Sequence, residues 1–269
     1  MTFPEPPMHD IAAHVLSQET LTADYRCLVL DAPAIARTAR PGQFVHLRVT
    51  GLEQSALRRP FSIYRAEGDR LSVLYKTVGR GTEQLSRLCT GETLAAMGPL
   101  GNGFPLQTEG QLPILVAGGF GVAPLAFLAR NLSTRGIVLI GGRTADDILC
   151  SEDFTALGWD VQVATLDGSR GENGLVTVLL DNWLATNAMQ PAEFYACGPY
   201  GMLRAVAERA ARAGARAWVS LDKHMVCGVG ACLACVQRLR RPNGTTWIAR
   251  VCRDGPVFEG REVVWEEPR

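Results

Sequence analysis

The chain has 269 residues, of which 47% are hydrophobic and 20% are charged, a composition typical of a globular protein long enough for two domains and a small appendage. Lysine plus arginine and aspartate plus glutamate each number 27, so the formal net charge is zero. Nucleic acids and anionic membranes favour a basic partner, so this balance argues against either as the main partner.

The first residues, Met1–Pro7, lack the basic region and apolar core of a secretion signal. The longest uncharged stretch, Gly110–Ala129, approaches membrane-spanning length but contains four glycines and two prolines. A spanning helix needs a steadier apolar run, so this stretch predicts a strand, a glycine turn and the start of a helix. We therefore expect a soluble, cytoplasmic protein with no membrane span.

Between Ile11 and Met97 the chain consists of short runs rich in β-branched and aromatic residues, separated by turn signals. Closely spaced strands of this kind predict an antiparallel β-barrel or a sandwich, and we assign a barrel domain to residues 1–105. One helix is predicted within it, over Thr82–Cys89. The strands are expected at Arg26–Leu30, Phe44–Val49, Phe61–Tyr64 and Leu71–Tyr75.

Within this region, the run Arg59–Ser62 (Arg-Pro-Phe-Ser) has the side chains of a ligand-binding strand. An arginine pairs with a phosphate, an aromatic ring stacks on another ring, and a serine hydrogen-bonds a ring nitrogen. Further on, Gly81 and Thr82 begin the predicted helix, with Thr82 as its N-cap and the turn as an anion site. Taken alone, an exposed strand with a satisfied arginine is an equally good explanation.

From about residue 106 to 215, short apolar runs alternate with helical segments, which predicts βαβ units and a parallel sheet. Strands are expected at Ile114–Ala117, Ile137–Ile140, Asp160–Ala164 and Glu193–Ala196. The first helix is expected to end near Leu132, and the others to cover Ala145–Leu157, Gly174–Asn187 and Gly201–Ala213.

Two turns in this α/β region have the composition of a ligand-binding edge. Gly118, Gly119 and Gly121 follow the first strand and precede a helix, where exposed N–H groups and the helix dipole favour a pyrophosphate. The spacing departs from the dinucleotide fingerprint, so tight packing without a ligand remains open. The second turn follows the last strand and contains Cys197, Gly198 and Pro199, with the cysteine at the strand end. A cysteine there is more often a small buried apolar residue than a functional thiol.

The remaining segment, residues 216–269, is too short for a self-sufficient core and needs a further stabilising link. Four of the eight cysteines, Cys227, Cys232, Cys235 and Cys252, are concentrated in it. Their C-x4-C-x2-C…C spacing matches the plant-type ligand set of a [2Fe–2S] cluster. The residues between them are small, as expected for a loop whose backbone N–H groups turn towards sulfur. The alternatives are a zinc site, although structural zinc usually shows two CxxC knuckles, and four unrelated buried thiols.

Together these motifs resemble the ferredoxin reductase superfamily. The run Arg59–Ser62 resembles its flavin-binding strand, and Gly118–Pro124 and Cys197–Pro199 resemble its nicotinamide-dinucleotide motifs. The C-terminal part is similar to one branch, the electron-transfer subunits of class B, NAD-dependent dihydroorotate dehydrogenase. That similarity is carried by Cys227–Cys235, Arg250–Phe258 and Glu262–Trp265.

The resemblance implies an FAD-binding barrel, an NAD-binding α/β domain and a [2Fe–2S] domain. It also implies a partner, a catalytic subunit with FMN that oxidises dihydroorotate to orotate in pyrimidine biosynthesis, with two copies of each chain. Electrons would leave the partner's FMN, pass singly through the cluster to FAD, and depart as hydride to NAD+. No side-chain acid or base is needed for hydride transfer, so no catalytic residue is assigned.

Residue roles follow from the resemblance by position. Those implied to contact the flavin are Arg59, Pro60, Phe61, Ser62, Leu74, Tyr75 and Lys76, with Gly81 and Thr82 at the pyrophosphate. Those implied to bind the nicotinamide dinucleotide are Gly118, Gly119, Gly121, Cys197, Gly198 and Pro199.

The choice between NAD and NADP is left open by the residues after the strand that ends near Leu166. Asp167 disfavours a 2′-phosphate and fits NAD, whereas Ser169 and Arg170 favour NADP. The family favours NAD. Two rival functions remain: an NAD(P)H-dependent ferredoxin oxidoreductase or sulfhydrogenase subunit, and a redox-sensing module without turnover.

Overall fold

The computed structural model describes residues 7–48, 57–108 and 110–265. The end of the predicted strand at Val49 lies outside these residues. Within them, no helix is both long enough and apolar enough to cross a bilayer.

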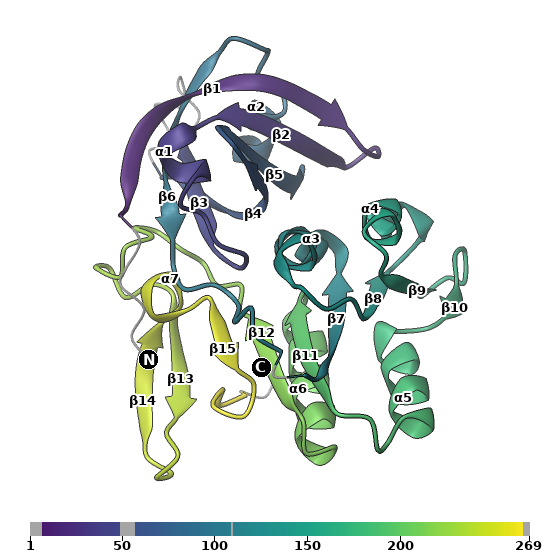
Figure 1. Cartoon of the computed structure of the whole chain (residues 1–269). Coiled ribbons are helices and arrows are strands. Elements are labelled where there is room, and N and C mark those ends of the chain that lie inside the picture. Colours follow the sequence, from purple (N-terminus) through teal and green to yellow (C-terminus); the bar gives the residue numbers. More distant parts are fainter. Residues whose placement is uncertain (1–6, 49–56, 109, 266–269) are drawn as a thin grey trace.

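The first part of the chain is a closed antiparallel barrel, as predicted, with strand order β1-β2-β5-β4-β3-β6 (Figure 1). Alternate side chains of each strand point inward, and Leu28, Leu30, Leu71 and Val73 are fully buried there. Short helices α1 (Pro33–Ala36) and α2 (Arg80–Leu85) cover the barrel. The strands are β1 (His9–Thr20), β2 (Tyr25–Asp31), β3 (Phe44–Arg48), β4 (Arg59–Glu67), β5 (Arg70–Lys76) and β6 (Thr93–Leu100).

The second part is built on a seven-stranded sheet of order β10-β9-β8-β7-β11-β12-β15. All neighbours are parallel except β15, which pairs antiparallel to β12. The strands are β7 (Leu112–Gly118), β8 (Ile137–Gly142), β9 (Asp160–Thr165), β10 (Glu172–Asn173), β11 (Ala192–Cys197), β12 (Arg216–Ser220) and β15 (Val257–Glu259). The helices are α3 (Val122–Asn131), α4 (Ser151–Ala156), α5 (Val176–Thr186) and α6 (Tyr200–Arg212).

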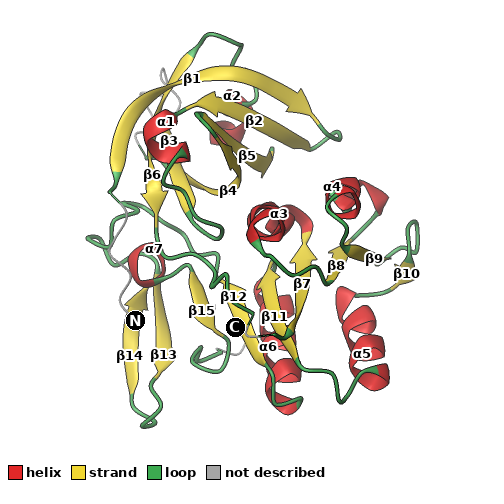
Figure 2. Cartoon of the chain, in the orientation of Figure 1, coloured by secondary structure: helices red, strands yellow, loops and turns green. Residues whose placement is uncertain are grey.

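Helices cover both faces of this sheet (Figure 2). Along β7, Ile114 and Val116 pack with α5 and α6, while Leu115 and Ala117 pack with α3 and α4 on the opposite face. Helix α3 is buried along Val122–Ala129. It is apolar all round because it lies between the sheet and the barrel, and its Phe127 packs into the barrel core.

Two predicted helices are shorter than expected. Instead of Ala145–Leu157 the chain forms a 3₁₀ turn (Ala145–Asp147) and then α4, because Cys150 adopts a left-handed conformation (φ 59°) that interrupts helical hydrogen bonding. Instead of Thr82–Cys89, α2 ends at Leu85. There the backbone N–H of Cys89 donates to the Glu92 carboxylate, which turns the chain towards β6.

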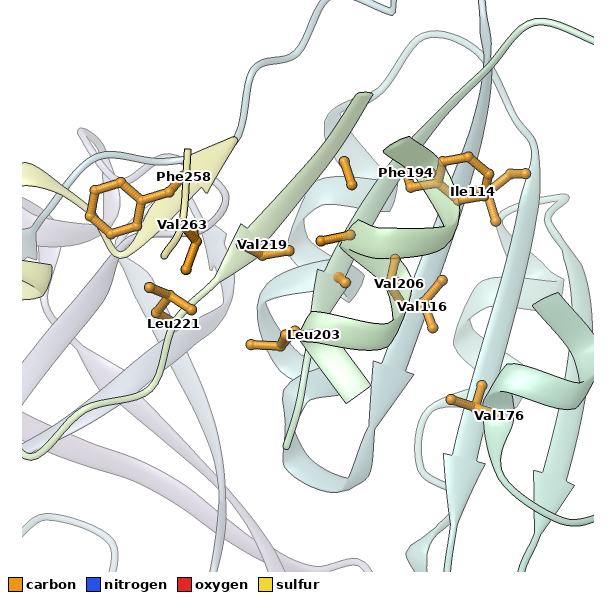
Figure 3. Packing of buried hydrophobic residues seen from close by; sticks show 14 of the residues in the cluster. Ile114, Val116, Val176, Phe194, Leu203, Val206, Val219, Leu221, Phe258 and Val263 are labelled. Carbon is orange, nitrogen blue, oxygen red and sulfur yellow. The ribbon is translucent and has the colours of Figure 1, made fainter. Parts of the chain in front are cut away.

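The C-terminal part shares strands with the sheet. Its first strand, β12, and its last, β15, both belong to the seven-stranded sheet, with β15 at the edge. Between them lie the hairpin β13 (Val236–Arg240) and β14 (Thr246–Arg250) and the short helix α7 (Val251–Asp254). One apolar core runs from α6 through Val219 to Phe258 and Val263 (Figure 3). This shared core supplies the burial that so short a segment lacks alone.

We expect Phe258→Ala to lower the free energy of unfolding by about 3–5 kcal/mol, because its ring is 6% exposed and its loss leaves a cavity in the shared core. The measurement is urea denaturation followed by tryptophan fluorescence. Met189→Ala, at a side chain that is 94% exposed, is the control and changes stability by less than about 0.5 kcal/mol. Equal effects of the two variants would contradict the shared core.

Candidate cofactor-binding sites

A cleft of about 880 Å³ opens at the carboxyl ends of β7, β8 and β11. The glycine-rich turns Gly118–Gly121 and Gly198–Gly201 line it, and Tyr25 and Lys76 of the barrel close it from the other side. Strands β8 and β11 lie on opposite sides of β7, so the direction of the connections reverses here. Open α/β sheets bind their ligands at such a point.

The glycines of the two turns allow the backbones to touch. A Cβ on Gly121 would collide with the carbonyl oxygen of Cys197, and a Cβ on Gly198 would lie 3.0 Å from the backbone nitrogen of Gly118. The first turn leads directly into α3, whose amino end favours an anion. Bare backbone at a helix amino terminus, at the edge of a large cleft, fits the pyrophosphate of a dinucleotide.

Cys197 is the last residue of β11 and lines the cleft, at the strand end predicted from sequence. Burial raises the pKa of its thiol to about 12. The thiol is therefore neutral at physiological pH, and it contributes a small, weakly polar surface to the cleft rather than a nucleophile.

Asp147 joins the barrel to the sheet at the cleft wall. Its carboxylate accepts a hydrogen bond from the Tyr25 hydroxyl at 3.0 Å and one from Arg143 Nε at 2.8 Å. The Lys76 ammonium lies 3.8 Å away. The hydrogen bond from Arg143 is the main reason that the pKa of Asp147 falls to about 2. Sequence reasoning missed this residue; its only signal is its place shortly after the end of β8, at the ligand edge.

The side chains of the run Arg59–Ser62 are half-buried at the start of β4. A Cβ on Gly81 would collide with the Arg59 guanidinium, so this arginine lies against the first turn of α2. Phe61 packs edge-on against Tyr75, with ring centroids 5.7 Å apart. The structure thus brings four of the residues implied to contact a flavin into two contacting pairs.

Leu74, Tyr75 and Lys76 have different surroundings. Leu74 is buried in the apolar layer that includes α3, whereas Tyr75 packs in the barrel core and donates to Gln18 at 3.0 Å. Lys76 reaches the cleft, with its ammonium 3.0 Å from the Asp24 carboxylate. These three side chains therefore do not share one surface.

Thr82 is not the N-cap that sequence reasoning expected. The cap is Gly79, and Thr82 lies at the third position of α2. Its hydroxyl accepts hydrogen bonds from the backbone N–H groups of Val78 at 2.8 Å and Gly79 at 3.2 Å. Thr82 therefore holds the preceding turn from inside the helix, which keeps Gly81 against Arg59.

The four C-terminal cysteines form two pairs. In each pair the backbone N–H of one cysteine donates to the sulfur of the other: Cys232 donates to Cys227 Sγ, and Cys252 donates to Cys235 Sγ. Two pairs of thiols match a dinuclear cluster with two thiolates at each iron better than they match one tetrahedral zinc.

Backbone N–H groups surround these sulfurs. Those of Ala231 and Cys232 lie 3.3 and 3.4 Å from Cys227 Sγ, and that of Cys252 lies 3.4 Å from Cys235 Sγ. Burial alone would raise the pKa of Cys227, but these N–H groups lower it to about 6. Donors aimed at sulfur stabilise thiolate ligands, so this loop fits an iron–sulfur cluster.

The residues after β9 are those from which the sequence left the choice between NAD and NADP open. Asp167 is exposed and accepts hydrogen bonds from the backbone N–H and hydroxyl of Ser169, the latter at 2.6 Å. Arg170 donates to the Ser151 hydroxyl at 2.9 Å. The carboxylate is thus presented to solvent, while the arginine that favoured NADP already has a protein partner.

Comparison with known protein families identifies two parts of the chain. Residues 222–264 match the family described as the iron-sulfur cluster binding domain of dihydroorotate dehydrogenase B. Residues 115–208 match the oxidoreductase NAD-binding domain family. These ranges contain the paired thiols and the glycine-lined cleft.

Whole-chain comparisons agree. The chain is 39% identical over 258 residues to the "Dihydroorotate dehydrogenase B (NAD(+)), electron transfer subunit" of Bacillus cereus strain B4264, covering 93% of this chain and 96% of that protein. A solved structure of NADH-dependent reduced ferredoxin-NADP oxidoreductase has a TM-score of 0.82 at 30% identity. The match covers 94% of this chain and 90% of that one. A ferredoxin NADP+ reductase of Neisseria gonorrhoeae with bound FAD and NADP has the same fold, with a TM-score of 0.62 and 16% identity. The match covers 76% of this chain and 92% of that one.

We expect Asp147→Ala to lower the free energy of unfolding by about 1–3 kcal/mol, because the buried Tyr25 hydroxyl loses its acceptor. In the wild-type protein, ionised Asp147 stabilises the fold above pH 3.8, and this stabilisation is lost as the pH falls towards about 2. The reason is that the pKa of Asp147 is lower in the folded protein than in the unfolded chain. Urea denaturation at pH 7 and at pH 2 measures both effects. Asp146→Ala, at the exposed neighbouring carboxylate, is the control, and an equal loss there would contradict the bridge.

Proposed function

Because this chain belongs to the family of electron transfer subunits of dihydroorotate dehydrogenase B, we propose that it carries electrons from a partner dihydroorotate dehydrogenase subunit with FMN to NAD+. The observation that carries this proposal is the pairing of the four cysteines beside a core that is continuous with the NAD-binding sheet. We further propose that the complex contains two copies of each subunit and works in the cytoplasm.

When bound, a [2Fe–2S] cluster relays single electrons and FAD collects two and exchanges a hydride with NAD+. In this chain, Cys227, Cys232, Cys235 and Cys252 would hold the cluster. The run Arg59–Ser62, with Gly81 and Thr82, would hold the flavin. The turns at Gly118 and Cys197 would place the dinucleotide in the cleft beside the barrel. These residues act by positioning, since hydride transfer needs no acid or base.

We propose NAD rather than NADP as the dinucleotide. The exposed carboxylate of Asp167 would meet the ribose hydroxyls and repel a 2′-phosphate. Arg170 is held by Ser151 instead of facing a phosphate.

The partner subunit would cover the exposed side of the cluster loop. Exposed apolar side chains gather around it: Leu233 is 61% exposed, Val226 41% and Val236 37%. On the neighbouring strand β14, Ile248 is 53% exposed, and it shares the outward face of the hairpin with Val236. An exposed apolar surface beside a relay site suits a protein partner, because the partner then excludes water and shortens the electron path.

The proposal predicts that the purified, reconstituted chain shows flavin absorption with an added iron–sulfur shoulder, and that NADH without oxygen bleaches both. Cys252→Ser should remove the shoulder and the bound iron, about two atoms per chain, while NADH still bleaches the flavin. The control is Cys89→Ser, at an exposed thiol of the barrel. Absence of flavin after reconstitution would contradict the proposal.

The same experiment distinguishes the proposed function from its main alternative. Bleaching much faster with NADPH than with NADH, and reduction of ferredoxin in place of the FMN subunit, would favour a ferredoxin oxidoreductase like the solved structure at 30% identity.

For the partner surface, we expect Leu233→Glu to weaken binding of the FMN subunit at least tenfold, because it buries a charge at the centre of the apolar surface. The measurement is isothermal titration calorimetry with the holoprotein. Bleaching by NADH should remain unchanged. Met189→Glu, remote on the α/β part and 94% exposed, is the matched control. Unchanged affinity of Leu233→Glu would place the partner elsewhere.

A further inference from the structure

His46 is a buried imidazole without a hydrogen-bonding partner. Its side chain is 0% exposed, and neither Nδ1 nor Nε2 has a partner among the described residues. Burial lowers its pKa to about 4, so the ring is neutral and has one N–H donor. A buried donor without a hydrogen-bond acceptor lowers the free energy of unfolding by about 1–3 kcal/mol. Such a group in a folded protein calls for an explanation.

The position of His46 supplies one. On strand β3 it pairs with Pro60 of the flavin-motif strand. Its ring faces the cluster loop, since a Cβ on Gly228 would lie 2.8 Å from both Nδ1 and Cε1 of His46. Gly228 follows Cys227 directly. His46 thus lies on the strand next to the one assigned to the flavin, and its ring faces the loop assigned to the cluster.

Phe44 packs edge-on against the ring, with ring centroids 5.7 Å apart. Gly228 has φ +73°, a conformation that glycine favours, and is itself buried. The ring lies so close to the loop that its donor is shut off from water, and no described residue supplies an acceptor. The group that the loop binds is therefore the candidate acceptor.

We propose that His46 is a positioning residue for electron transfer, whose ring N–H donates a hydrogen bond to a sulfur of the cluster held by Cys227. This inference rests on the proposed function. Hydrogen bonds to cluster sulfur stabilise the reduced, more negative state and raise its reduction potential. The same bond would hold the loop against β3, the neighbour of the flavin strand.

The test is a redox titration of the reconstituted holoprotein, with the reduced cluster followed by electron paramagnetic resonance. His46→Leu should lower the ratio of reduced to oxidised cluster about tenfold at the wild-type midpoint potential, a shift of 59 mV for a one-electron couple. His46→Gln places an amide N–H near Nε2 and His46→Asn places one near Nδ1. One of these should restore most of the shift and so identify the donor nitrogen. His14→Leu, at an exposed histidine of β1, is the matched control and should not change the potential.

Iron, sulfide and flavin contents are measured for every variant. A wild-type protein without flavin and cluster would defeat the proposed function itself. A His46→Leu protein with full cluster content and wild-type potential would overturn only the role of His46. If His46→Leu loses the cluster, the polar variants decide: a wild-type potential in one supports the donor role. Loss of the cluster in both polar variants would show that His46 only fills space in the core, and it would overturn the proposed donor role.

Discussion

The arrangement of the whole molecule depends on the burial of helix α3. The helix is apolar all round, since its residues face the sheet on one side and the barrel on the other. Burying a leucine or phenylalanine side chain contributes about 1.5–3 kcal/mol, so the barrel and sheet cannot separate without exposing a costly surface. Because α3 begins at the glycine turn of the cleft, the same burial fixes the cleft beside the barrel.

Hydrogen bonds between the barrel and the α/β part add to this packing. They end on two carboxylates. Asp147 ties Tyr25 to the cleft wall, and Asp153 of α4 accepts hydrogen bonds from Tyr64 and, at 2.7 Å, from Arg65. These three bonds join the barrel to the α/β part at buried or half-buried positions, where a misplaced donor is costly. The barrel thus has one orientation, and that orientation sets the geometry between a flavin and a nicotinamide.

The sequence was informative where chemistry depends on local spacing. The cysteine pattern, the glycine turn after β7 and Cys197 at the end of β11 could all be placed because their meaning lies within a few residues. It was uninformative where partners are distant: Tyr25 and Asp147 are separated by 122 positions, and His46 meets Gly228 across most of the chain. The left-handed turn at Cys150, whose thiol meets the Tyr64 hydroxyl, and the membership of β12 and β15 in the sheet depend on such tertiary contacts. The cap of α2 is local, and sequence reasoning placed it three residues too late.

That last feature explains how a short cluster segment can carry electrons. Cys235 and Cys252 are buried in the core that also holds Phe194 and Val219 of the sheet, whereas Cys232 and Leu233 are exposed. A cluster held by these thiols has one side open to a partner and the other fixed to the reductase body. An independent domain on a flexible tether would have to be ordered at each encounter. Sharing strands with the sheet removes that cost, and it keeps the distance between relay and flavin constant through turnover.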